Sequence, residues 1–163
     1  MHRFITCALL ILLSGCKSIP MPGSETKGGA PFSTPEQAPP GYATLVIYRE
    51  RGAITLSFDI DFFVNDTAVA QLGRLTYTYV YVKEGLTSVR FGQAEDAAKK
   101  RTVQFEAVAG ETYFLKHVVR QTLITPVPVA VVHTSINFNF IEPSTAQREL
   151  SNSRYIAPTV RSL

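Results

Sequence analysis

Residues 75–91 read LTYTYVYVKEGLTSVRF, and this stretch decides the fold class of the chain. In residues 75–82 tyrosines alternate with threonines and valines, so a strand here has one aromatic face and one largely β-branched face. Both kinds of residue favour strands. Lys83, Glu84 and Gly85 predict a turn, and Val89 and Phe91 then mark the next strand.

Similar strand patterns occur on both sides of this stretch. Short runs of β-branched and aromatic residues, separated by turn residues, predict strands over residues 44–49, 57–64, 67–72, 102–108, 112–120 and 131–140. Asn65 and Asp66 tolerate the left-handed backbone of a tight hairpin turn. Ser144 and Gln147 have the spacing of a capping box, which predicts a short helix over residues 144–150. We therefore expect an all-β protein, an antiparallel β-sandwich of seven or eight strands with a short C-terminal helix.

The first residues have the pattern of a bacterial lipoprotein signal. Arg3 precedes an apolar run over residues 4–13, and residues 10–16 read LILLSGC. This run is too short to cross a bilayer, because a spanning helix needs roughly 20 apolar residues. We expect residues 1–15 to be cleaved as a signal peptide and Cys16 to carry a lipid anchor.

The remainder divides into three parts. Residues 16–40 are rich in proline and glycine, which predicts a lipidated tether. Residues 41–150 carry the predicted strands and helix and form the β-sandwich domain. Residues 151–163 form a C-terminal tail, which contains Pro158 and is expected to fray.

Composition narrows the function classes. The 16 basic and 13 acidic residues are interspersed, so no basic patch indicates a nucleic-acid partner. Cys7 leaves with the signal and Cys16 is used by the lipid, so no thiol remains for a disulfide or a cysteine-based zinc site. We expect neither a cofactor nor a metal ion.

Four residues are candidates for catalysis or metal binding. Asp59 and Asp61 lie two apart in a predicted strand, a separation of about 7 Å that suits a glycosidase pair or part of a calcium site. The alternative is a solvated strand face, which the lack of supporting residues favours. His117 and His133 lie in separate predicted strands; we expect His117 to be half buried with one hydrogen bond and His133 to lie on a polar face. No motif for a nucleophile or a phosphate loop is present, so we expect no catalytic residue and no enzyme.

Two sets of side chains are candidate binding surfaces. One is the aromatic face of residues 75–82, which either stacks on sugars or peptides or packs in the core or at its rim. It consists of Tyr77, Tyr79 and Tyr81. The other is the apolar segment 122–130, whose two prolines argue against an interior strand, so that it either folds back on the core or forms an exposed contact surface. Its candidate contact residues are Leu123, Ile124, Val127 and Val129.

Four phrases, followed by the predicted helix, occur in an order that resembles a known family. They are GYATLVIYRE (41–50), FFVNDTAVAQL (62–72), TYTYVYVKEGLTSVRF (76–91) and TVQFEAVAGETYFLKHVV (102–119). The order resembles that of small bacterial lipoproteins built on a domain of unknown function, numbered twenty-eight forty-six. The resemblance covers residues 41–150 and implies a transthyretin-like or immunoglobulin-like sandwich in the cell envelope, without an activity. Where such domains usually have Pro-Pro-Gly, this chain has Lys83, Glu84 and Gly85.

Together these patterns predict a non-enzymatic, lipid-anchored cell-envelope protein, a binding or structural module on the periplasmic side of the outer membrane. Lys17 and Ser18 after the cysteine resemble the pattern that is sorted to the outer membrane. The expected partners are the membrane, through acyl chains on Cys16, and a protein or glycan of the envelope. Two alternatives stay open: an envelope carbohydrate-binding module or hydrolase, and an accessory lipoprotein of a secretion apparatus.

Overall fold

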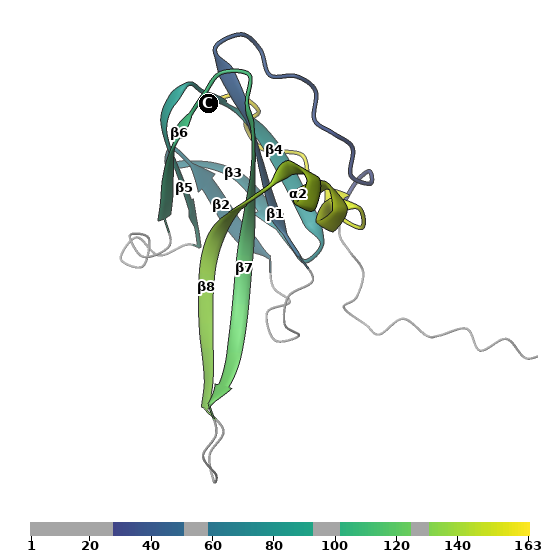
Figure 1. Ribbon diagram of the computed structural model, residues 1–163, viewed down its shortest axis with the longest axis vertical. Coiled ribbons are helices and arrows are strands. Elements are labelled where there is room, and N and C mark those ends of the chain that lie inside the picture. Colours follow the sequence, from purple (N-terminus) through teal and green to yellow (C-terminus); the bar gives the residue numbers. More distant parts are fainter. Residues whose placement is uncertain (1–27, 51–58, 93–101, 125–130) are drawn as a thin grey trace, which may run out of the picture.

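The computed structural model describes residues 28–50, 59–92, 102–124 and 131–163, with residues 120–124 and 131–134 described by their backbone alone. These residues form two sheets and one short helix, which confirms the expected all-β sandwich with a C-terminal helix (Figure 1). One sheet has the strand order β8-β7-β1-β4-β9 and the other β3-β2-β5-β6. The elements are β1 (Tyr42–Arg49), β2 (Ile60–Val64), β3 (Thr67–Leu72), β4 (Thr76–Lys83), β5 (Gly85–Phe91), β6 (Thr102–Ala107), β7 (Thr112–Ile124), β8 (Val131–Ile141), α2 (Pro143–Leu150) and β9 (Arg154–Tyr155).

Among the described residues most strand pairs are antiparallel and two are parallel. The consecutive strands β2/β3, β5/β6 and β7/β8 pair antiparallel, as expected for hairpins. β1 also pairs antiparallel with β4, but β1/β7 and β4/β9 are parallel. In both parallel pairs a long stretch of chain separates the strands, so no tight turn fixes their relative direction.

The turn predicted at Lys83, Glu84 and Gly85 carries the chain from one sheet to the other. β4 ends at Lys83 in the five-stranded sheet, and β5 begins at Gly85 in the four-stranded sheet. Gly85 has a φ of 117°, a conformation that residues with a side chain rarely adopt. The hairpin turn predicted at Asn65 and Asp66 is confirmed, because both residues have positive φ, 46° and 62°.

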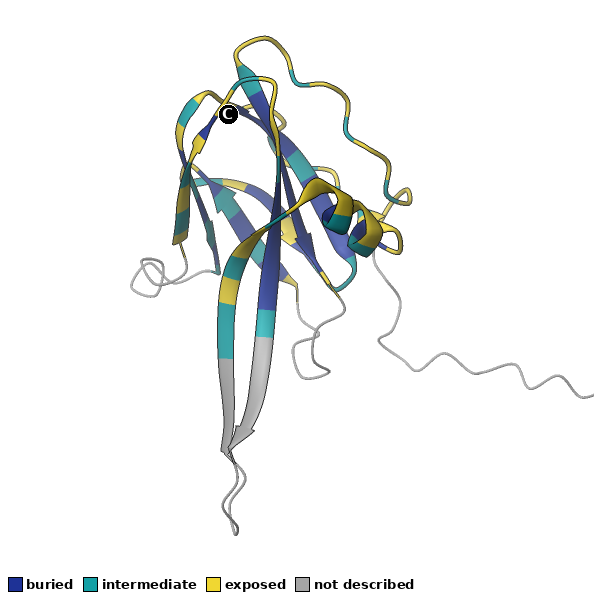
Figure 2. Ribbon diagram, in the orientation of Figure 1, coloured by how far each residue is buried: buried dark blue, intermediate teal, exposed yellow. Residues whose placement is uncertain are grey.

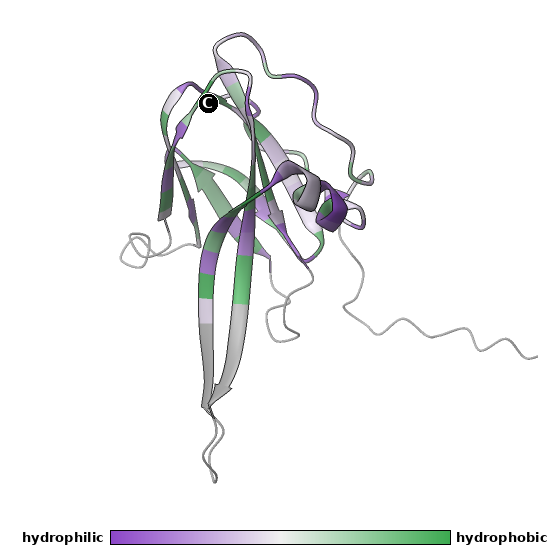
Figure 3. Ribbon diagram, viewed as in Figure 1, coloured by the Kyte–Doolittle hydropathy of each residue, from purple (hydrophilic) through white to green (hydrophobic). Residues whose placement is uncertain are grey.

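The main core lies between the two sheets. Alternation along each strand directs one set of side chains inward, and Leu45, Ile47 and Val80 of the five-stranded sheet pack in one cluster with Phe62 and Phe91 of the other. Figure 2 shows the buried residues concentrated on β1, β4 and the upper half of β7. Figure 3 shows the corresponding alternation of hydrophobic and hydrophilic residues along the strands.

A second apolar layer lies on the outer face of the five-stranded sheet, where α2 crosses it (Figure 1). Ala146 and Leu150 of α2 are fully buried there. The predicted capping box is wrong, because Glu142 is the N-cap residue and no side chain caps the helix. Pro143 begins the helix instead, at a position where its missing N–H needs no partner.

Residues 28–40, expected to be part of the tether, lie along the edge of the five-stranded sheet, and we call them the N-terminal strap (Figure 1). The Gly29 amide donates a hydrogen bond to the Tyr155 carbonyl at 2.7 Å, and the Tyr155 amide donates to the Ala30 carbonyl at 2.9 Å. The strap therefore belongs to the folded body. Residues 16–27 of the expected tether lie outside the described residues.

The C-terminal tail is paired with strands rather than frayed. The Leu163 amide donates to the Tyr81 carbonyl at 2.9 Å, and the Lys83 amide donates to the Leu163 carbonyl at 2.8 Å. The Thr159 amide donates to the Val69 carbonyl of β3 at 2.7 Å. The backbone groups at the edges of β3 and β4 thus provide hydrogen-bond partners for the tail. The sequence of the tail alone does not indicate these partners.

Candidate functional site

The tyrosine row of β4 lies on the outer face of the five-stranded sheet, beneath the strap and the C-terminal residues. Tyr77 is 2% exposed and Tyr81 7% exposed, while Tyr79 is partly buried. The ring of Phe32 in the strap packs edge-on against Tyr77 with centroids 5.2 Å apart. The ring of Tyr155 lies 5.4 Å from Tyr77 and 5.5 Å from Tyr79. The sequence left open whether this row binds a ligand or packs in the fold. Tyr77 is a packing residue, because neighbouring side chains cover its ring.

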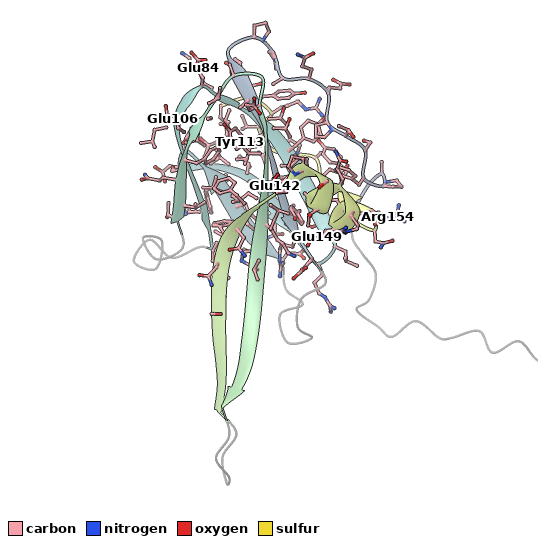
Figure 4. The ribbon with its side chains drawn as sticks, viewed as in Figure 1. Glu84, Glu106, Tyr113, Glu142, Glu149 and Arg154 are labelled. Carbon is pink, nitrogen blue, oxygen red and sulfur yellow. The ribbon has the colours of Figure 1, made fainter. Side chains whose placement is uncertain are left out.

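A polar cluster that the sequence analysis did not find lies between α2 and the same sheet. Nζ of Lys116 on β7 lies 2.6 Å from Oε2 of Glu50 and 3.1 Å from Oε1 of Glu149. Glu149 projects from α2 (Figure 4) and also accepts a hydrogen bond of 2.7 Å from the Tyr48 hydroxyl. The Lys116 side chain is only 11% exposed, so the two carboxylates replace most of its hydration.

These contacts fix the protonation states of the polar cluster. Burial acts to lower the pKa of Lys116, but the bonds to Glu50 and Glu149 outweigh it and raise the pKa above its ordinary value. Burial likewise opposes ionisation of Glu149, yet the bonds from Tyr48 and Lys116 lower its pKa. Burial and then the bond to Glu149 raise the pKa of Tyr48. None of the three groups is poised to transfer a proton near neutral pH, and the cluster fastens α2 to the sheet.

A second polar pair lies inside the sandwich, where Arg49 of β1 and His117 of β7 are register partners. His117 is 2% exposed, and its ring makes edge-on contacts with Phe62, Phe91 and Phe138 at centroid distances of 5.5, 4.5 and 6.0 Å. Neither ring nitrogen has a hydrogen-bond partner among the described residues. His117 is therefore a packing group, but it is more deeply buried than expected and lacks the expected hydrogen bond.

The electrostatics of this pair keep the histidine neutral. Burial lowers the pKa of His117 to about 3, and the charge of Arg49 adds to the shift. Arg49 is itself 3% exposed and donates from Nη1 to the Leu72 carbonyl at 2.6 Å. Burial lowers the pKa of Arg49, while the carboxylate of Asp59 opposes that shift. The imidazole is enclosed by aromatic rings, so it has no path to a substrate.

The structure separates one of the two candidate aspartates, Asp61, from His117. Asp61 lies on the outer face of β2 and accepts a hydrogen bond of 3.1 Å from Gln71, whereas His117 lies in the core on the opposite face of that sheet. Asp59 is exposed just before β2. His133 lies on β8, and its side chain is outside the described residues. In the part of the chain that is described, no group of three or more His, Cys, Asp or Glu residues is placed to hold a metal ion.

The apolar segment 122–130 begins on a projecting arm. β7 and β8 form a hairpin that extends well beyond the rest of the sandwich (Figure 1). Leu123 pairs with Val132 and Ile124 with Val131, so the described start of the segment is strand, and its two prolines lie outside the described residues. Val127 and Val129 lie outside the described residues.

Arg49, Lys116 and Glu149 are the functional or structural residues that sequence reasoning missed. One signal was present for Lys116, because residues 113–119 read YFLKHVV and a lysine among apolar residues on both strand faces must find a partner if it is buried. The sequence contains no comparable signal for its partner Glu149, 33 residues away.

Comparisons with known proteins do not assign this chain to a family. No family model matches the chain, and no curated protein matches it. Among the described residues, none of the helices has the length and apolar character needed to cross a bilayer. The family resemblance of the four sequence phrases therefore stays a prediction.

Proposed function

We propose that this chain is a non-enzymatic, lipid-anchored protein of the bacterial cell envelope, held by acyl chains on Cys16 and serving as a binding or structural module on the periplasmic side of the outer membrane. The observation that carries the proposal is the stretch LILLSGC at residues 10–16, an apolar run closing on small residues and a cysteine. Two or more acyl chains hold a protein at a membrane far longer than one chain does.

The docked strap supports a close attachment of the domain to the membrane. The described residues begin at Gly28, and the next residue, Gly29, is hydrogen-bonded to Tyr155. The stretch from Cys16 to Gly28 can span at most about 40 Å, because each residue adds at most about 3.5 Å. The proposed anchor therefore keeps Gly28 within about 40 Å of the bilayer surface.

Two features of the folded body favour binding or support over catalysis. Asp61 and His117 lie on opposite faces of the four-stranded sheet, and Lys116 of the polar cluster is held in ion pairs with Glu50 and Glu149. The β7/β8 hairpin projects beyond the sandwich with apolar Leu123 and Ile124 in its outer half, which provides an arm for contact with an envelope partner.

The anchor is tested by fractionating cells that express the wild-type chain, Cys16→Ser or Cys7→Ser. We expect Cys16→Ser to lose the acyl mass on the mature N-terminal peptide and to appear in the soluble periplasmic fraction. Cys7→Ser is the matched control, because the signal peptide carries that thiol away, and it should remain acylated and membrane-bound. A sucrose gradient then separates inner from outer membranes, and protease added to intact cells tests which side the domain faces. Membrane retention of Cys16→Ser, or a free thiol at Cys16 in the native product, would contradict the proposal.

A further inference from the structure

The described residues leave four strands with a neighbour on one side only, and their edges differ in how they are protected. These strands are β3, β6, β8 and β9. The C-terminal tail lies against β3 through the bond from Thr159 to Val69, and the strap lies against β9 through Tyr155. β6 is six residues long and carries Glu106 on its exposed face. β8 is the exception, because within the described residues it pairs with β7 alone.

β8 lacks the features that usually protect an edge strand. Its 11 residues read VVHTSINFNFI, without Lys, Arg, Asp, Glu or Pro. Natural edge strands are commonly short or carry charges, prolines or bulges, since a long neutral edge presents a row of unpaired N–H and C=O groups to other strands. Figure 2 shows that β7 is buried over its upper half, while residues 135–141 of β8 beside it are exposed or intermediate. Phe140 remains 44% exposed.

The strand is complementary to a second copy of itself. In a symmetric antiparallel pair each residue i opposes a residue of the same parity, so each face of the strand meets the same face of the copy. If Phe138 lies on the two-fold axis, Ile136 opposes Phe140 of the second copy, and Asn137 opposes Asn139 of the second copy. Aromatic and aliphatic side chains then meet on one face, and amides that both donate and accept hydrogen bonds meet on the other.

We propose that β8 is a homodimerisation edge, at which β8 of a second copy adds antiparallel and joins the two five-stranded sheets into one continuous sheet. A second copy fits because a neutral strand brings no like charges together on self-pairing, whereas β6 would place Glu106 near its own copy. Residues 135–141, which this register pairs, are hydrogen-bonded to β7 alone within the described part of the chain, so their other edge is open to a second strand. The pairing covers Phe140 and does not depend on the membrane anchor.

The test measures the mass of the full chain in a mild detergent by sedimentation velocity over a range of concentrations. We expect the wild-type chain to be a dimer at about 0.1 mM, where a Kd near 1 μM gives almost complete association. The variant Asn137→Lys/Asn139→Lys sets lysines opposite lysines at exposed positions, and we expect it to be monomeric with unchanged circular dichroism. The matched control is Gln104→Lys/Glu106→Lys, which puts two lysines at the same spacing on the exposed face of β6 and should stay dimeric.

Hydrogen exchange supplies a measurement that needs no variant. Amides of residues 135–141 in the wild-type chain should become more protected as the protein concentration rises, while those of β6 should not change. A wild-type chain that is monomeric throughout, a dimer that survives the β8 lysines, or exchange in residues 135–141 that is independent of concentration would each overturn the proposal.

Discussion

Replacing the buried histidine of β7 should remove one specific contribution to the acid sensitivity of the fold. His117 is 2% exposed, sits among aromatic rings and has no hydrogen-bond partner for either nitrogen in the described part of the chain. The substitution His117→Leu keeps a similar volume and removes the two polar atoms without leaving a partner unsatisfied. At pH 7 we expect the free energy of unfolding to change by less than about 1.5 kcal/mol.

The pH dependence has a definite sign and size. The folded protein holds the pKa of His117 at about 3, whereas the unfolded chain titrates near its ordinary value of about 6.5. Between these values the unfolded state binds the extra proton, so stability is complete above pH 6.5 and falls as the pH drops toward 3. Linkage gives a loss of about 2 kcal/mol at pH 5 and about 3 kcal/mol at pH 4.

The assay is urea unfolding of the wild-type chain and His117→Leu at pH 7, 6, 5 and 4. Far-ultraviolet circular dichroism is the probe, because the chain has no tryptophan for fluorescence. Subtracting the two pH profiles cancels the contribution of every other titrating group that the substitution leaves unchanged. The difference in unfolding free energy should shift in favour of the leucine variant by about 2 kcal/mol from pH 7 to pH 5.

Parallel pH profiles for the two proteins would refute the reasoning. If the leucine variant does not fold, an NMR titration of the His117 ring protons in the wild-type protein still tests whether the pKa of His117 is lowered. Those signals should not titrate between pH 7 and pH 5. A midpoint near 6.5 would show that the imidazole is accessible to solvent or partnered.

Two further predictions concern the outer layer of the five-stranded sheet. Phe32→Ala removes the ring that packs on Tyr77, so we expect the free energy of unfolding to fall by about 1–2 kcal/mol and hydrogen exchange at the Gly29 amide to become faster. Phe63→Ala on the other sheet is the control for exchange at Gly29. Unchanged exchange at Gly29 in the Phe32→Ala variant would contradict the docked strap. Glu149→Gln weakens the bonds from Lys116 and Tyr48 and should cost about 1–2 kcal/mol at pH 7, while Glu142→Gln, exposed at the start of the same helix, should cost little. Because the folded protein lowers the pKa of Glu149, this difference should shrink as falling pH protonates the carboxylate, and a difference that does not change with pH would count against the ion pair.

Local pattern was enough to predict β1 to β8 but not the short β9, because alternation and turn residues act over a few positions. Asn65 and Asp66 adopt the backbone that their side chains favour, and the strand predicted over residues 102–108 is β6. The choice of sheet was not predictable in the same way. Lys83, Glu84 and Gly85 indicate a change of direction, but a turn of this kind serves equally well within a sheet and between two sheets.

Burial of the candidate site was harder to predict, because it depends on segments that are remote in sequence. The tyrosine row has the same local pattern whether it is a binding platform or a packed layer, and Phe32 and Leu150 decide between them for Tyr77. The charged residues behave similarly: Lys116 is stable at its buried position because Glu50 and Glu149 arrive from two other elements. The sequence of the strand that carries Lys116 does not indicate these two partners.

The N-terminal strap shows why low apolar content does not by itself mean that a segment is a free linker. Its prolines and glycines indicate that it cannot bury enough surface to form a core of its own. It is nevertheless ordered, because β4 and β9 already present an aromatic surface and free backbone groups, and the strap adds Phe32 to the first and pairs with the second. The entropy lost on ordering such a segment is offset by contacts with a surface that the rest of the chain has built, and composition alone does not register that surface.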